Sequence, residues 1–231
     1  MSANTKSNAT AVTLNASTYS KVDLTVDTWT EVSFAIEDKE AAQVMRSYML
    51  QEKLSMNAGY TVANVLEDAI IALFATFTQT VGASTTGIAD SEIRGAIAKL
   101  DAGNVPQNDR MFFFDPVVFW SQIYALDRFV SRDFKNVSPV ETGFQGNLYG
   151  IPVKITTRIP YVSSTTGRVN FLGQKDAIVY ATHNLGGNGI FRIQANYIPD
   201  YLSTLVTADM VYGVAKNRDA CGVILYTKAT A

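Results

Sequence analysis

The sequence predicts an α+β fold in which a β arm leads into one long helix, followed by a mixed region of short elements. Three observations predict it. Residues 37–79 contain no proline and only one glycine. Ahead of them, apolar residues alternate with polar ones, as in half-exposed strands. Beyond residue 143, short β-like stretches are separated by turn residues, and all six prolines lie at or after Pro106. The first half is therefore suited to long elements and the second half to short ones.

The long helix is expected from Glu37 to Gln79, because apolar residues recur there at helical spacing. One helix of this length would extend roughly 65 Å, beyond the roughly 45 Å diameter of a compact globule of this size. We therefore expect an elongated subunit whose helix is partly covered by neighbouring copies. The alternative is two helices broken at Gly59, since glycine inside a helix costs about 1 kcal/mol. The predicted buried stripe consists of Met45, Met49, Met56, Tyr60, Ala63, Ile70, Phe74 and Phe77.

The arm is expected to be a two-stranded ribbon ahead of this helix. Its apolar residues occupy alternate positions, at Val12, Leu14 and Ala16 and then at Val22, Leu24, Val26, Val32, Phe34 and Ile36. A two-stranded ribbon is only marginally stable alone, and unpaired strand edges favour pairing with another chain. We therefore expect residues 9–31 to form an intersubunit arm outside the core of the subunit.

The second half is expected to contain short helices and strands. A short helix is capped by Asp90 or Ser91. A buried strand follows at Met111–Phe114, and Asp115 then caps a helix with Pro116 at its first position, where the missing N–H does no harm. The further expected strands are residues 151–156, 177–181, 190–197, 205–214 and 222–227, with a turn at 216–219.

Composition limits the function classes. Nineteen basic and 21 acidic residues give a net charge of −2, and no basic run marks a protein that reads nucleic-acid sequence. The polar N-terminus lacks the regions of a signal peptide. The longest apolar run, Ala69–Ala75, is far shorter than the roughly 20 residues of a membrane-spanning helix. A single cysteine allows no internal disulfide and is consistent with a reducing cytoplasm.

Residues that carry chemistry are sparse. His183 is the single histidine and cannot supply a multi-histidine metal site, so we interpret it as a surface loop residue. Cys221 is expected to be a buried structural thiol. Gly186, Gly187 and Gly189 fit neither a P-loop nor a dinucleotide-binding fingerprint. The sequence therefore predicts no catalytic, metal-binding or cofactor-binding residue.

Four segments, taken in order, resemble the major capsid proteins of tailed bacteriophages with the Hong Kong 97-type fold. Residues 32–77, which end in GYTVANVLEDAIIALF, resemble the junction of the E-loop arm with the spine helix. LDAGNVPQNDRMFFFDPVVFWSQI resembles a passage of short helix, NVP, basic residue, strand and proline-opened helix. GNLYGIPVKITTRIP is similar to a strand ending in a proline turn, and VYGVAKNRDACGVILY to the closing strands. Relatives usually carry a longer N-terminal arm and a first E-loop strand ahead of the spine.

This resemblance implies a structural protein and not an enzyme. Its copies are expected to assemble as pentamers and hexamers into an icosahedral shell of the virion, formed in the host cytoplasm. The implied domains are an N-terminal segment and β arm (1–36), a peripheral domain (37–81 and 195–231) and an axial domain (82–194). Implied partners are further copies, weakly and non-specifically bound double-stranded DNA, and decoration or scaffolding proteins, with no membrane and no cofactor. The subunit-interface candidates are Val26, Trp29, Glu31, Arg46 and Lys53.

Three other functions are considered. An encapsulin-like compartment has the same fold and encloses a cargo enzyme, so a neighbouring cargo gene would favour it. An α+β enzyme without recognised motifs is disfavoured by the scarcity of histidine and cysteine. A fibre or adhesin module would suit the threonine-rich arm, but the long helix and the absence of repeats disfavour it.

Overall fold

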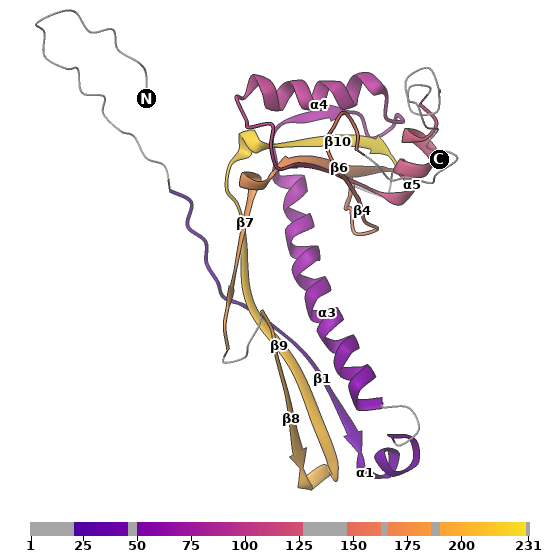
Figure 1. Cartoon of the computed structure of the whole chain (residues 1–231), viewed down its shortest axis with the longest axis vertical. Helices are drawn as coiled ribbons and strands as arrows, with labels where there is room; N and C mark the ends of the chain where they lie inside the picture. Colours follow the sequence, from indigo (N-terminus) through magenta and orange to yellow (C-terminus); the bar gives the residue numbers. More distant parts are fainter. Residues whose placement is uncertain (1–20, 46–49, 127–146, 163–165, 186–189, 230–231) are drawn as a thin grey trace, which may run out of the picture.

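Two sheets and one long helix form an elongated molecule, as expected (Figure 1). The computed structural model describes residues 21–45, 50–126, 147–162, 166–185 and 190–229. A four-stranded sheet occupies one end and a six-stranded sheet the other. Helix α3 (Leu50–Ala72) runs beside the four-stranded sheet and ends against the six-stranded one (Figure 1).

The four-stranded sheet is built around β9 (Ser203–Lys216). Strand β1 (Thr28–Glu37) pairs with one edge of β9, while β8 (Arg192–Ile198) and β7 (Ile178–His183) pair in succession along the other edge. All these pairings are antiparallel. Strand β1 thus pairs with a strand far along the chain, and not with a second N-terminal strand as the predicted ribbon would require.

Strand β1 confirms part of the predicted arm and corrects another part. Val32 and Phe34 pack with the residues between α3 and β9, and Ile36 is buried, as the alternation predicts. Residues 21–27 form no strand, so the predicted strand is wrong before Thr28. Since Thr28–Glu31 pair with β9, these four residues belong to the subunit's own sheet and not to a separate arm. The earlier stretch at residues 12–16 lies outside the described residues.

The long helix is shorter than expected. Helix α3 has 23 residues, about 35 Å, and continues as a 3₁₀ turn at Leu73–Thr76. Before it lie α1 (Asp38–Glu40) and a π-helical turn at Ala41–Met45. Asp38 is held at the end of the four-stranded sheet, because its backbone N–H donates to Leu202 and its carboxylate accepts from the Tyr197 hydroxyl. The alternative break at Gly59 is also wrong, since this residue lies inside α3.

The predicted buried stripe is only partly correct. Phe74 and Phe77 are buried, and Ile70 is half-buried. Met56 and Tyr60, however, are 69% and 66% exposed, and Ala63 is exposed as well. The face that contacts the sheet instead carries the small residues Ala58 and Val62, which pack on Ala208, Met210 and Tyr212 of β9. Small residues allow a helix to approach a sheet closely, and this turns the larger side chains outward. The side chains of Met45 and Met49 lie outside the description.

The six-stranded sheet holds most of the core. Its order is β2 (Thr80–Gly82), β10 (Gly222–Lys228), β6 (Gly167–Gln174), β3 (Arg110–Phe114) and β4 (Val153–Ile155), with β5 (Tyr161–Val162) paired to β6. Strand β6 is buried at all but one position. Helix α4 (Asp90–Ala102) packs on β10 and β2 (Figure 1).

Most predicted elements of this half are confirmed. Asp115 accepts a hydrogen bond from the Val117 N–H at 2.9 Å and opens α5 (Pro116–Val118), which continues as a π-helical turn at Phe119–Ile123. The cap of α4 is a correction: the N-cap residue is Ala89, whose N–H donates to the Glu92 carboxylate at 2.9 Å. The expected strands near residues 151–156, 177–181, 190–197, 205–214 and 222–227 correspond to β4, β7, β8, β9 and β10.

The three connections between the two sheets meet at one junction. Thr78, between α3 and β2, donates its N–H to Asp219, between β9 and β10, at 3.2 Å. Lys216 donates to the same carboxylate at 2.7 Å. Asn217 donates its N–H to the Ala177 carbonyl, between β6 and β7, at 2.8 Å. The junction therefore ties the ends of both sheets together.

The predicted domain boundaries remain a prediction, and the two sheets do not follow them. Strand β10, which the division assigns to the peripheral segment 195–231, hydrogen-bonds within the six-stranded sheet. Strand β7, which it assigns to the axial segment 82–194, pairs with β9. Strands β7 and β10 both begin just after the junction, where the chain passes from one sheet to the other.

Candidate assembly surface

The five interface candidates lie in different surroundings. Trp29 and Glu31 are exposed residues of β1 on the face of the sheet opposite α3, because Val32 and Phe34 face the helix and side chains alternate. Val26 and Lys53 are each placed elsewhere: Val26 is half-buried ahead of β1, and Lys53 is exposed on α3. Arg46 lies outside the described residues. The structure thus brings only two candidates together, and their role in an interface stays a prediction.

Trp29 is anchored by a charge cluster that spans three strands. Its indole Nε1 donates to Asp209 Oδ2 at 3.2 Å. Arg192 donates from Nε to Asp209 Oδ1 at 2.9 Å and from Nη2 to Oδ2 at 2.6 Å. Asp209 is 3% exposed, whereas Trp29 is 68% exposed. The cluster therefore fixes one edge of the indole and leaves most of the ring available for contact. Sequence reasoning missed Asp209 and Arg192, because no local motif links these distant residues.

The electrostatics of the cluster favour neutral pH. The Arg192 guanidinium holds the pKa of Asp209 below its ordinary value against the opposing effect of burial, and Trp29 adds to this lowering. A carboxylate whose pKa is lower in the folded than in the unfolded chain stabilises the fold above the unfolded pKa. That stabilisation disappears as the pH falls through the folded pKa. The contribution is thus fully present at pH 7.

Replacing Asp209 with asparagine is expected to destabilise the subunit, because Arg192 then loses its carboxylate partner. We expect the melting temperature at pH 7 to fall by roughly 4 to 8 °C. The difference from wild type should shrink as the pH falls below the pKa of an aspartate in the unfolded chain, about 3.9, because the unfolded wild type then takes up a proton that the folded protein does not. Thermal melts followed by circular dichroism measure both effects. Glu31→Gln, which removes an exposed charge opposite Asp209 in the sheet, is the matched control and should leave the melting temperature nearly unchanged; an equal loss in both variants would contradict the role of the cluster.

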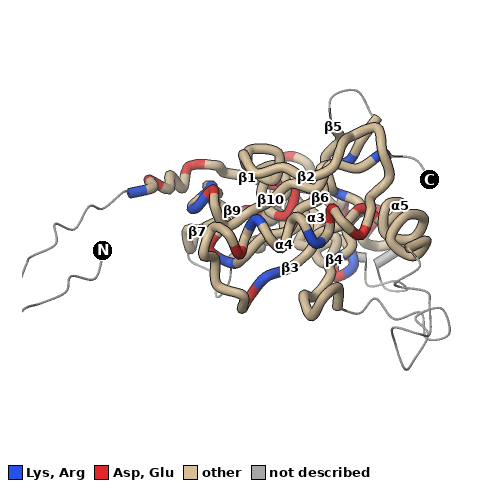
Figure 2. The backbone as a smooth tube through the Cα atoms, turned by 90° about the horizontal axis from the view of Figure 1, so that it is seen from above, with Lys and Arg blue, Asp and Glu red and all other residues tan. Residues whose placement is uncertain are grey.

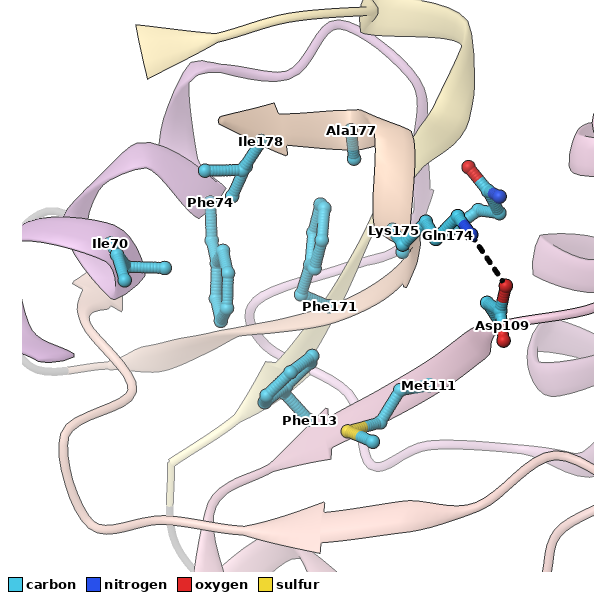
Figure 3. A pocket seen from close by; sticks show the side chains of 11 residues that line it. Ile70, Phe74, Asp109, Met111, Phe113, Phe171, Gln174, Lys175, Ala177 and Ile178 are labelled. Atoms are coloured by element: carbon cyan, nitrogen blue, oxygen red, sulfur yellow. Dashed lines mark ion pairs between the residues drawn. The ribbon is translucent and has the colours of Figure 1, made fainter. Parts of the chain in front are cut away.

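An apolar cavity lies at the junction of the two sheets (Figure 3). It has a volume of about 240 Å³ and is lined by Phe74 of the turn after α3, Phe113 of β3 and Phe171 of β6, among others. At its rim Lys175 and Asp109 form an ion pair of 3.0 Å. Because the charged rim residues neutralise each other and the interior is aromatic, the cavity contributes packing surface and carries no arrangement of groups for catalysis.

The surroundings of Cys221 and His183 do not favour catalysis or metal binding. Cys221 is fully buried as predicted, and burial raises the pKa of its thiol, which disfavours the nucleophilic thiolate. His183 is exposed as predicted, although it ends strand β7 and is not in a loop. Among the described residues, no group of three or more histidine, cysteine or acidic side chains is arranged to hold a metal ion. Gly186, Gly187 and Gly189 lie outside the description.

Charges on the described chain are mixed. Figure 2 shows basic and acidic residues interspersed along the backbone, in keeping with the net charge of −2. Many are paired with each other, such as Arg158 with Asp68 and Glu67. The described surface therefore shows no broad basic stripe of the kind that sequence-reading nucleic-acid binders use.

Helix α3 and the turn after it form a long apolar segment. Residues Gln51–Thr76 are long and apolar enough to cross a membrane by length and composition, yet only 28% of the most apolar window is buried in the subunit. A core helix of a water-soluble protein passes the same test. The contacts of Ala58 and Val62 with β9 show that one side of this helix is packed on protein, whereas Met56 and Tyr60 on its other side are exposed within the described part of the chain.

The comparison with known proteins identifies the fold. No protein-family model and no curated protein matches the sequence. Among solved structures, the capsid of cyanophage P-SCSP1u matches with a TM-score of 0.77 over 100% of this chain and 81% of that chain, at 16% identity. A chain of Mycobacterium phage Che8 matches with a TM-score of 0.74 over 88% of this chain and 72% of that chain, at 18% identity. This chain has the Hong Kong 97-type capsid fold.

The predicted fold class is thereby confirmed. The capsid fold also includes the SrpI encapsulin of Synechococcus elongatus, which matches with a TM-score of 0.63 over 90% of this chain and 75% of that chain, at 11% identity. An unrecognised α+β fold is excluded, because the fold is a known one. Viral shells and cellular compartments share the capsid fold, so the fold alone does not distinguish between these two functions.

Proposed function

We propose that this chain is the major capsid protein of a tailed bacteriophage. Its copies assemble as pentamers and hexamers into an icosahedral shell that encloses double-stranded DNA in the virion, after assembly in the host cytoplasm. The role is structural and needs no catalytic residue or cofactor. DNA is held by weak, non-specific contact, and decoration or scaffolding proteins are the further partners of the shell.

The observation that carries the proposal is the full-length likeness to a phage capsid. The cyanophage capsid chain matches all of this chain, so the similarity extends to both sheets and the helix and is not limited to one motif. The exposed large apolar side chains Met56 and Tyr60 of α3 also support assembly, because contact with a neighbouring copy would bury them. Scattered surface charge favours a shell protein over a protein that reads DNA sequence.

The encapsulin-like compartment is kept as the second candidate. One specific observation favours it, namely the match to the SrpI encapsulin at a TM-score of 0.63. Two phage structures match more closely, with TM-scores of 0.77 and 0.74. We therefore place the phage shell first.

Self-assembly is the direct test. The purified full-length chain is expected to sediment as very large particles and to show closed shells in negative-stain electron microscopy, because spine and arm leave apolar surface that neighbouring copies cover. Sedimentation as monomers or dimers under all tested assembly conditions would contradict the proposal. The contents of shells purified from the native source then separate the two candidates: packaged double-stranded DNA supports the phage shell, and an enclosed enzyme without a genome supports the compartment.

A further inference from the structure

The aromatic walls of the junction cavity are held in place by their own packing. The Phe74 and Phe171 rings stack with centroids 4.3 Å apart, and the Phe113 ring lies 5.2 Å from that of Phe74. Two glycines seat the Phe171 ring on the sheet, because its atoms lie 2.3 and 2.6 Å from where a Cβ on Gly173 and on Gly222 would stand. The walls are thus ordered before any molecule enters, as in most small-molecule sites.

Solvent reaches the cavity beside β3. Met111, which lines the cavity, is 38% exposed, and the side chains of Lys175 and Asp109 at the rim are 65% and 50% exposed. Met111 lies opposite Gly173 in the pairing of β3 with β6, so the neighbouring strand adds no side chain beside it. A small molecule can therefore reach the rings without unfolding of the subunit.

The interior is poor in groups that would hold water or a polar ligand. In the described part of the chain, two buried side-chain atoms lack a hydrogen-bond partner, Arg168 Nε and Ser203 Oγ, and neither residue lines the cavity. Gln174 does line it, but its side chain accepts the Asp176 N–H at 2.8 Å and points away from the three aromatic rings (Figure 3). Because a buried water typically makes about three hydrogen bonds, the cavity favours an apolar occupant.

Volume and charge define which apolar molecules fit. The cavity has a volume of about 240 Å³, whereas an apolar cavity of about 150 Å³ engineered into another protein stays dry and binds benzene. One aromatic ring, or two fused rings, therefore suits this space, and phenylalanine rings and the Met111 sulfur make favourable contacts with such rings. The Lys175–Asp109 ion pair at the rim has no net charge, so a charged ligand would have to break it.

We propose that the junction cavity is a binding site for a small uncharged aromatic molecule, which inserts its one or two fused rings beside Phe74, Phe113 and Phe171. The walls come from the turn after α3, from β3 and β6 of the six-stranded sheet, and from Ile178 at the start of β7 in the four-stranded sheet. The bound molecule contacts both sheets and so stabilises their junction. This binding goes beyond the role in a shell and does not depend on it, because the site lies within one subunit.

Equilibrium dialysis of the full-length wild-type chain against naphthalene tests the site. We expect saturable binding of about one molecule per subunit. The matched probe is 2-naphthoate, which adds a carboxylate to the same two rings. It should bind at least about tenfold more weakly, because the charge would lose its water without gaining a free cation at the rim.

Substitution at the mouth of the cavity localises the binding. Met111→Trp fills the opening with a larger side chain at a partly exposed position, and the affinity for naphthalene should fall at least about tenfold. Val117→Trp adds the same side chain at a 43% exposed position of α5 that does not line the cavity, and it should bind like wild type. Ile70→Phe narrows the cavity from α3 and provides a second variant in case Met111→Trp does not fold, as judged by circular dichroism.

Thermal melts give an independent measurement. A ligand that binds only the folded chain raises its melting temperature. At a naphthalene concentration about five times the dissociation constant, we expect a rise of about 2 to 4 °C for wild type and Val117→Trp. Folded Met111→Trp at the same naphthalene concentration should show almost no rise.

The outcomes decide the inference separately from the shell function. Naphthalene binding that is lost in a folded cavity variant and kept in Val117→Trp supports it. Absence of binding to wild type, equal binding to the folded cavity variants, or binding of 2-naphthoate as tight as that of naphthalene would each overturn it. None of these results bears on whether the chain forms shells.

Discussion

Replacing Phe74 with aspartate is expected to abolish folding of the subunit. Phe74 is 1% exposed, and its ring stacks on Phe171 of β6 with centroids 4.3 Å apart and lies 5.2 Å from Phe113 of β3. It is thus the side chain through which the end of the long helix packs on the six-stranded sheet. A carboxylate there would be buried among aromatic rings without a cation, at a cost of several kcal/mol. That is comparable to the whole stability of a typical domain.

Soluble yield and circular dichroism after expression measure this effect. Ala72→Asp introduces the same charge on the same helix at an exposed position and should remain soluble and folded. Phe74→Ala should fold with a loss of about 3 to 5 kcal/mol in unfolding free energy. Ile70→Asp is expected to be milder than Phe74→Asp, because Ile70 is only half-buried at the edge of the junction cavity. Cooperative unfolding of Phe74→Asp at the wild-type temperature would show that the ring is not part of the core.

Deleting residues 1–24 is expected to leave a folded subunit that no longer closes into shells. The deletion stops before Thr25, which lies against Gly213 of β9, and keeps all of β1, including Trp29 and its hydrogen bond to Asp209. The subunit's own hydrogen bonds and core are therefore retained. What is lost is most of the segment that the sequence predicts to be an intersubunit arm, so assembly should fail while the circular dichroism spectrum stays near that of wild type.

A longer deletion provides the contrast. Removing residues 1–31 also removes Thr28–Glu31 from β1 and leaves Asp209 without its Trp29 contact, so a lower melting temperature is expected in addition to lost assembly. Electron microscopy and thermal melts of both deletions separate the two effects. If the chain without residues 1–24 forms normal shells, the segment has no role in joining copies, even where the shell function itself holds.

Local chemistry made several elements predictable from the sequence. Asp115 and Pro116 mark a helix start because the carboxylate accepts a backbone N–H and proline needs no donor there. The apolar run at Met111–Phe114 and the alternation from Val32 to Ile36 correspond to strands in the structure. In each case the side chains that decide the structure lie within a few residues of one another.

Strand β6 shows where such reasoning stops. It is the central strand of the larger sheet, but buried Asn170 interrupts its apolar pattern. That amide donates to Thr227 Oγ1 at 2.8 Å and accepts from the Asp115 N–H at 2.9 Å. Both partners are more than 50 residues away in the chain. A polar residue can be buried when distant groups satisfy it, and a sequence does not reveal which distant groups will meet.

The sequence by itself determined the α+β class, the presence of a long helical region and the scarcity of catalytic side chains, because these follow from periodicity and composition. Only the tertiary structure decided which side of α3 is buried. Met56 and Tyr60 of the predicted stripe are exposed, whereas Ala58 and Val62 face the sheet together with the partly buried Val65 and Leu66. The large apolar side chains of Met56 and Tyr60 are thereby left exposed on the described subunit, where contact with another copy can bury them.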